Sequence, residues 1–148
     1  MNKVRNCLVK VNIKKPWSYL FERALVISQQ IGDKSGEGII LNNIGLVYRN
    51  LGQYQKALDY YQQALVISQQ IGDKSREGTI LNNIGAVYRS LGQYPKALDY
   101  YQQSLVIRKQ IGDKSGEGTT LHNIGFVYEN LGQYQQSLYY YQQALDIC

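Results

Sequence analysis

The chain has 148 residues, two cysteines and a formal net charge of +5. Five of its sixteen basic residues lie within positions 1–16, which leaves eleven basic and eleven acidic residues in the remainder. Because that remainder is neutral, the net charge does not by itself indicate a nucleic-acid-binding protein. The sequence also contains no run of about eighteen apolar residues, so it predicts no membrane span.

Residues 1–16 carry the basic excess and are predicted to form a poorly ordered N-terminal tail. A contact of this tail with nucleic acid or an anionic membrane is the alternative interpretation. Pro16 suits the first turn of a helix, which the sequence predicts over 17–31. Trp17 stands where the next two copies of this helix have Ala57 and Ala97, and we expect its ring to cover the end of the helical stack.

A block of forty residues then repeats with little change. Residues 38–77 and 78–117 differ at eight positions, and a shorter third copy covers 118–148. A fixed period of this length is typical of a solenoid, in which each unit buries its apolar face only against its neighbours. We therefore predict a single domain over 17–148, with a partial repeat over 17–37 before the three copies. A solenoid offers a long surface rather than a closed pocket, which favours a binding protein over an enzyme.

Within one copy, apolar residues recur at helical spacing in two runs. Leu41 and Ile44 belong to the first run, which ends at Gly52, a residue type that commonly terminates helices. The second run ends at Gly72, after which the Asp73 side chain can cap the next helix. Each copy is therefore predicted to be two antiparallel helices, and the fold class is all-α. The predicted helices after the first are 34–51, 54–71, 74–91, 94–111, 114–131 and 134–147.

Two groups of residues are assigned to packing rather than to function. Gly45, Gly85 and Gly125 lie inside first helices, where glycine costs about 1 kcal/mol relative to alanine, so we interpret them as sites of close helix approach. Tyrosines such as Tyr48 and Tyr61 fall in apolar columns and are predicted to be core. Three other tyrosines are predicted to be exposed, namely Tyr60, Tyr100 and Tyr140.

The motif Leu41-x-x-Ile44-Gly45-x-x-Tyr48, followed by Gly52-x-Tyr54-x-x-Ala57 and Tyr61-x-x-Ala64, resembles the tetratricopeptide repeat. The forty-residue period and the Gly-Asp-Lys-Ser-Gly-Glu-Gly connector resemble the long-helix subclass found in kinesin light chains, spindle-orientation scaffolds and bacterial multidomain signalling proteins. The resemblance covers residues 17–148. It implies a right-handed α-solenoid of antiparallel helix pairs, about three and a half repeats long, whose first helices line a concave groove.

No set of residues predicts catalysis, a metal site or a cofactor. The connector at 32–38 lacks the residue order of a phosphate-binding loop, and Ile44 stands where a calcium loop needs its glutamate. His122 is the single histidine, so the sequence offers neither a metal cluster nor a catalytic triad around it. Cys7 and Cys148 lie at opposite ends of the predicted stack, too far apart for a disulfide, which suits a reducing, cytoplasmic location.

The copies differ mainly along one stripe of their first helices. Most of the changing positions are spaced three, four, three and one apart, so they share one helical face. Residues that differ between copies of one scaffold are not needed for stacking, which favours a partner-binding face. Neutral drift on a solvent-exposed face is the alternative.

Asparagines that do not change between copies lie beside this stripe. By the resemblance to kinesin light chains, Asn43, Asn83 and Asn123 form a ladder that pairs with the backbone of an extended peptide. Hydrogen bonds between helices of the stack are the alternative. Arg49 and Arg89 flank the ladder and would suit a carboxylate. The predicted partner-binding residues are Asn42, Asn43, Leu46, Arg49, Asn82, Asn83, Ala86, Arg89, His122, Asn123 and Phe126.

We therefore expect a protein-interaction scaffold that holds an extended or helical peptide in the concave groove, without enzymatic activity, cofactor or small-molecule substrate. The alternative is a sensory or regulatory segment of a larger bacterial signalling enzyme, with catalysis outside this chain. No polar capping helix follows the last predicted helix, so four of its residues are expected to be partly bare, namely Leu138, Tyr141, Leu145 and Ile147. This predicts either a piece of a longer protein or end-to-end self-association through the C-terminal helix.

Overall fold

The computed structural model describes residues 16–147, and these form seven α-helices and no strand. The helices are α2 (Pro16–Gln30), α3 (Lys34–Asn50), α4 (Tyr54–Ile71), α5 (Lys74–Ser90), α6 (Tyr94–Ile111), α7 (Lys114–Asn130) and α8 (Tyr134–Ile147). All seven predicted helices are confirmed, with ends that differ from the prediction by at most one residue. Pro16 belongs to α2, whereas the rest of the predicted tail and both cysteines lie outside the described residues.

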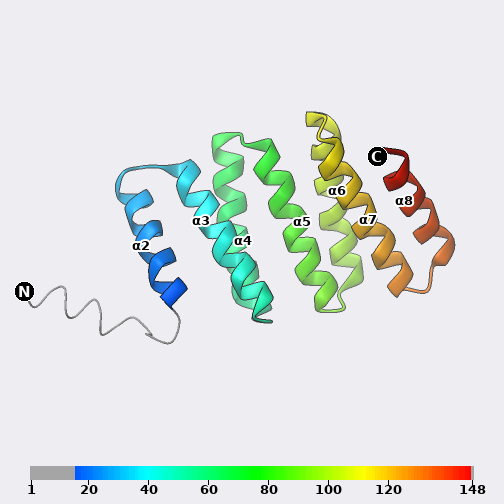
Figure 1. Ribbon diagram of the computed structural model, residues 1–148, viewed down its shortest axis with the longest axis horizontal. Helices are drawn as coiled ribbons and strands as arrows, with labels where there is room; N and C mark the ends of the chain where they lie inside the picture. Colours follow the sequence, from blue (N-terminus) through cyan, green and yellow to red (C-terminus); the bar gives the residue numbers. More distant parts are fainter. Residues whose placement is uncertain (1–15, 148) are drawn as a thin grey trace, which may run out of the picture.

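The helices follow one another along a single row, from α2 at one end to α8 at the other (Figure 1). The closest pairs are α3 with α4, α5 with α6 and α7 with α8, which are the predicted antiparallel pairs. Each second helix then packs on the first helix of the next pair, as α4 does on α5. The described residues therefore form a solenoid, whose core continues from one pair to the next.

Local capping chemistry sets where the first helices begin. The carboxylates of Asp33, Asp73 and Asp113 each accept a hydrogen bond from the backbone N–H three residues later, at 2.8, 3.0 and 2.9 Å. The residue before each aspartate is a glycine, and Gly72, for example, has a φ of +70°. A side chain is disfavoured in that left-handed conformation, so glycine ends the second helix and aspartate starts the next one.

A tyrosine ring packed across a glycine joins the two helices of each pair. A Cβ atom added at Gly45 would lie 2.7 Å from the Tyr61 ring, and one at Gly85 would lie 2.7 Å from the Tyr101 ring. Both rings have no exposed surface. The predicted role of these glycines in close helix approach is therefore confirmed, because only a residue without a side chain leaves room for the ring.

The stack is curved, with the first helices on its inner side. The first helix α3 contacts α5, and α5 contacts α7. No two second helices among residues 16–147 contact each other. Successive first helices are therefore closer together than successive second helices. This places α3, α5 and α7 on the concave face of the solenoid.

The prediction that Tyr60, Tyr100 and Tyr140 are exposed is wrong, because all three are half-buried. Each stacks on a tyrosine of the preceding first helix, and Tyr60 lies parallel to Tyr48 with a centroid distance of 5.5 Å. The other two pairs are Tyr88 with Tyr100 at 5.5 Å and Tyr128 with Tyr140 at 5.4 Å. Trp17 meets the Tyr48 ring edge-on at 5.8 Å, so its ring covers part of the first pair.

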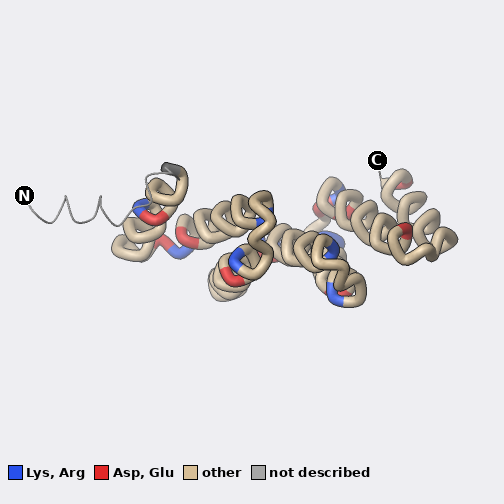
Figure 2. The backbone as a smooth tube through the Cα atoms, turned by 90° about the horizontal axis from the view of Figure 1, so that it is seen from below, with Lys and Arg blue, Asp and Glu red and all other residues tan. Residues whose placement is uncertain are grey.

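Charged residues of the two signs lie close together, mostly near the ends of helices (Figure 2). Lysines at the start of α3, α5 and α7 pair with glutamates three residues later, at N–O distances of 2.9 to 3.2 Å. The charges therefore balance locally along the array. No helix within residues 16–147 has the length and apolar character needed to cross a membrane.

Gly85→Ala is expected to destabilise the fold by about 1–3 kcal/mol, because the added methyl group would overlap the buried Tyr101 ring. The matched control is Gly118→Ala in α7, where the nearest atom to the new methyl group is a backbone oxygen at 3.9 Å. Because alanine has a higher helix propensity than glycine, this change should leave stability unchanged or raise it by up to about 1 kcal/mol. Urea unfolding followed by circular dichroism measures both, and equal midpoints would contradict the close-approach role of Gly85.

Candidate protein-binding surface

The set of eleven residues that the sequence predicts to bind a partner lies on α3, α5 and α7, the helices of the inner side. Its two large apolar side chains are both open to solvent, since Leu46 is 36% exposed and Phe126 is 38% exposed. Ala86 occupies the corresponding place on α5 and is half-buried. The changing position held by Leu46, Ala86 and Phe126 is therefore at least partly accessible, whereas another changing position, held by Ile80 and Thr120, is buried.

The asparagines beside the stripe form hydrogen bonds between repeats. The Asn83 amide donates to the side-chain oxygen of Asn42 at 3.1 Å, and the Asn123 amide donates to that of Asn82 at 3.0 Å. Each bond joins a first helix to the preceding first helix. The carboxamides of Asn83 and Asn123 retain an oxygen and a second N–H for another partner.

The position of Arg49 and Arg89 carries a different charge in the last repeat. Both arginines are half-buried, and the Arg89 guanidinium lies 5.0 Å from the centre of the Phe126 ring, a cation–π contact. Glu129 takes this position on α7 and accepts a hydrogen bond from the Tyr141 hydroxyl at 2.7 Å. Burial and then this hydrogen bond to Glu129 raise the pKa of Tyr141 to about 12.

The equivalent tyrosines of the earlier repeats differ from Tyr141. Tyr61 and Tyr101 are completely buried, and within residues 16–147 neither hydroxyl has a hydrogen-bond partner. Burial raises the pKa of both hydroxyls. The charge of Arg49 opposes this effect at Tyr61, and those of Arg89 and Arg49 oppose it at Tyr101. The arginines on the inner face therefore act electrostatically on these hydroxyls.

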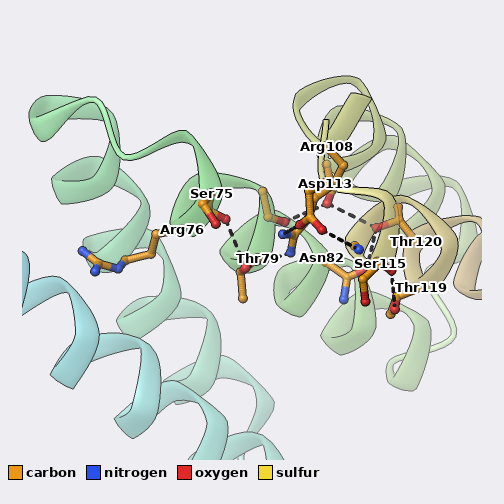
Figure 3. Close-up of polar contacts among 12 residues, drawn as sticks. Ser75, Arg76, Thr79, Asn82, Arg108, Asp113, Ser115, Thr119 and Thr120 are labelled. Carbon is orange, nitrogen blue, oxygen red and sulfur yellow. Dashed lines mark hydrogen bonds and ion pairs between the residues drawn. The ribbon is translucent and has the colours of Figure 1, made fainter. Parts of the chain in front are cut away.

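A second polar cluster lies along the edge formed by the turns between repeats, and the sequence analysis missed it. Arg108 donates to the Asp113 carboxylate and, at 2.8 Å, to the Thr79 hydroxyl (Figure 3). Hydrogen bonds from the Gly116 backbone and from Arg108 lower the pKa of Asp113, against the effect of its burial. Arg108 Nε is buried without a partner among the described residues. This cluster joins α5, α6 and the start of α7.

The preceding junction uses another arginine for the same purpose. Arg76 reaches the backbone oxygen of Ser35 at 3.3 Å and pairs with Asp73 at 3.2 Å, pointing away from the Arg108 cluster (Figure 3). The two arrangements exclude each other, because a side chain at Gly116, the counterpart of Arg76, would collide with Arg108. Between the two copies, Arg76 is replaced by Gly116 while Arg108 appears, and this paired change is visible in the sequence of the repeats. It indicates structural compensation rather than binding.

An open pocket of roughly 770 Å³ lies between α7 and α8, and its lining includes His122, Tyr141 and Leu145. Leu145 is 67% exposed, whereas its counterpart Leu65 is 8% exposed under α5. The pocket thus occupies the place where a first helix packs in the earlier repeats. Within residues 16–147, no group of three histidine, cysteine, aspartate or glutamate side chains could hold a metal ion.

Antiparallel helix pairs that stack in one row and present their first helices on an inner face define a helical-repeat scaffold protein. A family model described as tetratricopeptide repeat matches residues 19–70 and 76–148. The chain therefore belongs to the tetratricopeptide repeat family, as its motifs predicted.

Solved structures with this architecture include BtubC (BKLC) from P. vanneervenii, which is 27% identical over 86% of this chain, with a TM-score of 0.78. The chain spans about half of that protein, 53%. The tetratricopeptide repeat domain of Arabidopsis FLU is 24% identical over 76% of this chain and 95% of its own length, with a TM-score of 0.71, and shows the shared fold alone.

A signal transduction ATPase with a tetratricopeptide repeat sensor, from Pyrococcus horikoshii, is 25% identical over 91% of this chain, with a TM-score of 0.72. The matched part is 21% of the ATPase. A comparison with curated proteins finds no match.

Asn83→Ala is expected to lower the free energy of unfolding by about 1 kcal/mol, because it removes the hydrogen bond to Asn42 across the repeat junction. The matched control is Asn43→Ala, since Asn43 is exposed and has no hydrogen-bond partner within residues 16–147. That change should stay within about 0.5 kcal/mol of the unaltered protein. Chemical denaturation measures both variants, and an equal loss in the two would show that the junction bond contributes nothing.

Proposed function

We propose that this protein is a scaffold that binds a partner protein through an extended or helical peptide segment on the inner face of α3, α5 and α7. The tetratricopeptide repeat fold, which the family match establishes, is a fold of protein–protein interaction. The further step, from the fold to this particular face, is supported by the residues on it. We also expect the protein to act in the cytoplasm, without catalysis of its own.

The observation that carries the proposal is the coincidence of variation and exposure on the first helices. Leu46, Ala86 and Phe126 occupy one position in the three copies and are at least partly accessible. Most of their buried neighbours, such as Leu41 and Ile44, are kept in every copy, whereas the buried Ile80 is replaced by Thr120 in the last one. Side chains that stacking does not need, and that differ in size from repeat to repeat, form a surface that can distinguish one partner from another.

The mixture of side chains on the inner face suits a peptide. Leu46 and Phe126 offer apolar contact area, Arg49 and Arg89 offer charge, and the half-satisfied asparagines offer hydrogen bonds to a backbone. A role as the sensory segment of a larger signalling enzyme would use the same surface. The test of the surface therefore applies to both roles.

Selection of random short peptides on the immobilised full chain tests this proposal. Selected peptides are expected to bind in isothermal titration calorimetry and to lose at least about tenfold in affinity with Leu46→Glu, which places a charge in the inner face. The matched control is Val66→Glu, because Val66 is 50% exposed on a second helix, outside the inner face. Binders that Val66→Glu weakens and Leu46→Glu does not would place the site elsewhere, and failure to select any binder would also count against the proposal.

A second proposed role is self-association through the pocket between α7 and α8. Its supporting observation is that Leu145, Ile147 and Tyr141 are more exposed than their counterparts in the second helices of earlier repeats, which the next first helix covers. Exposed apolar surface of this kind marks interaction sites. A second copy of the chain, which presents the same open end, is the partner that we propose for it.

Leu145→Gln is expected to shift this self-association toward the monomer, because it places a polar amide in the apolar pocket. Sedimentation equilibrium over a range of protein concentrations measures the change, with Leu20→Gln as the control. Leu20 is 66% exposed on α2, at the opposite end of the stack. A chain that stays monomeric at every concentration would rule out the contact.

A further inference from the structure

The open surface of α8, at the end of the row of helices, exists twice more within the chain in a covered form. The first helices α5 and α7 cover α4 and α6, whereas no helix among residues 16–147 covers the outer side of α8 (Figure 1). Leu65 and Leu105 are 8% and 6% exposed beneath the covering helices, and their counterpart Leu145 is 67% exposed. The two covered junctions therefore show which chemistry fits the open one.

In the first covered junction, α5 uses three residues on one of its sides. Arg76, Ile80 and Asn83 are spaced four and three residues apart, which places them on the same side of the helix. Arg76 donates to the backbone oxygen of Ser35 at 3.3 Å, and the Asn83 amide donates to Asn42 at 3.1 Å. Between them, Ile80 is completely buried in the apolar cluster that α4 and α5 share. A guanidinium, an aliphatic side chain and an amide at this spacing therefore close the junction.

The pocket between α7 and α8 repeats the receiving side of that junction. Its lining includes Thr119, His122 and Leu145. His122 is the counterpart of Asn42, and Leu145 is the counterpart of Leu65. The pocket thus joins an apolar floor to polar groups at the positions where a covering helix is held in the earlier repeats.

At the edge of the pocket, Thr119 offers an acceptor for a guanidinium. Its counterpart Thr79 accepts a hydrogen bond from Arg108 at 2.8 Å in the second junction. The Thr119 hydroxyl donates to the Ser115 backbone at 3.0 Å, so its oxygen is left to accept (Figure 3). Residue 148, which follows Arg108 by one copy, is a cysteine and supplies no cation. The guanidinium for Thr119 therefore has to come from a docked helix, as Arg76 does in the first junction.

His122 stands where the earlier junctions accept an amide. Asn42 and Asn82 each accept a hydrogen bond from the asparagine of the next first helix, at 3.1 and 3.0 Å. On α7 their place is taken by His122, which is exposed and contacts the Tyr141 ring at a centroid distance of 5.1 Å. One ring nitrogen of a neutral imidazole is an acceptor. His122 can therefore receive the amide N–H of a docked helix, as the two asparagines do.

We propose that the pocket between α7 and α8 binds an amphipathic helix of a partner protein, built like α5. Such a helix carries an arginine, an aliphatic residue four positions later and an asparagine three positions after that. The arginine donates to the Thr119 hydroxyl, the aliphatic residue packs on Leu145, and the asparagine amide donates to His122. This helix and the second copy proposed above need the same apolar surface, so they exclude each other, and the bound helix keeps the chain monomeric.

The probe is a fluorescent synthetic peptide with the sequence of residues 73–91, which includes α5 and its capping aspartate. Fluorescence anisotropy with the full chain is expected to show saturable binding, because an amphipathic helix can fold into an apolar groove. The matched control is the peptide of residues 113–131, the α7 sequence. It has Gly116 and Thr120 in place of Arg76 and Ile80, and it should bind at least about tenfold more weakly.

Substitutions in the pocket locate the peptide. Leu145→Gln is expected to weaken binding of the α5 peptide at least about tenfold, whereas Leu20→Gln, at the opposite end of the stack, should leave it unchanged.

A double-mutant cycle tests the contact with His122. His122→Phe in the chain and Asn83→Ala in the peptide should each weaken binding about fivefold, since each removes the same hydrogen bond. The two together should weaken it no more than either alone. His122→Asn should keep the affinity, because it restores the acceptor of the earlier junctions.

The outcomes separate this inference from the proposed roles. Equal binding of the α5 and α7 peptides, or equal effects of Leu145→Gln and Leu20→Gln, would overturn it, and independent effects of His122→Phe and Asn83→Ala would overturn the contact between them. If the α5 peptide does not bind while the chain self-associates through Leu145, the occupant is a second copy and the helix site is wrong. If the peptide binds a chain that is monomeric at every concentration, the helix site stands and self-association fails.

Discussion

The packing of a tyrosine ring across a glycine is the contact on which the rest of this structure depends. It occurs once in every helix pair, at Gly45, Gly85 and Gly125, and it brings the backbone of the first helix against the ring of the second. The distance between this backbone and the ring sets how closely the two helices of a pair pack, and so how the next pair can stack on them.

Repetition of this contact leaves other positions free to change, and they change in two different ways. At the edge of the stack the changes compensate each other: Arg108 replaces Arg76 as the residue that crosses the junction, and Gly116 removes the side chain that would block it. On the inner face no compensation is visible between Leu46 and its counterparts. Compensated changes preserve a junction between repeats. Uncompensated changes on an accessible face alter the side chains that a partner can contact.

The asparagines belong to both the stack and the surface. Asn83 and Asn123 each use an N–H to bond the preceding repeat, so part of their constancy has a structural cause. Asn43 is exposed and has no such bond within the described residues. The carboxamide has more donors and acceptors than one bond consumes. A ladder that both joins the repeats and offers its remaining groups to a peptide backbone is consistent with this geometry.

The sequence by itself determined the helices and their pairing, because the signals that end them are local. Aspartate caps and left-handed glycines act within a few residues, and a period of forty residues shows that one pair recurs. Only the tertiary structure decided the features that depend on the register between helices. The burial of Tyr60 depends on Tyr48 of the partner helix, the bond of Asn83 depends on Asn42 forty-one residues away, and the missing partner of the Tyr101 hydroxyl depends on how its ring passes Gly85. Such contacts depend on the precise position of one helix relative to another. No local sequence pattern predicts that position.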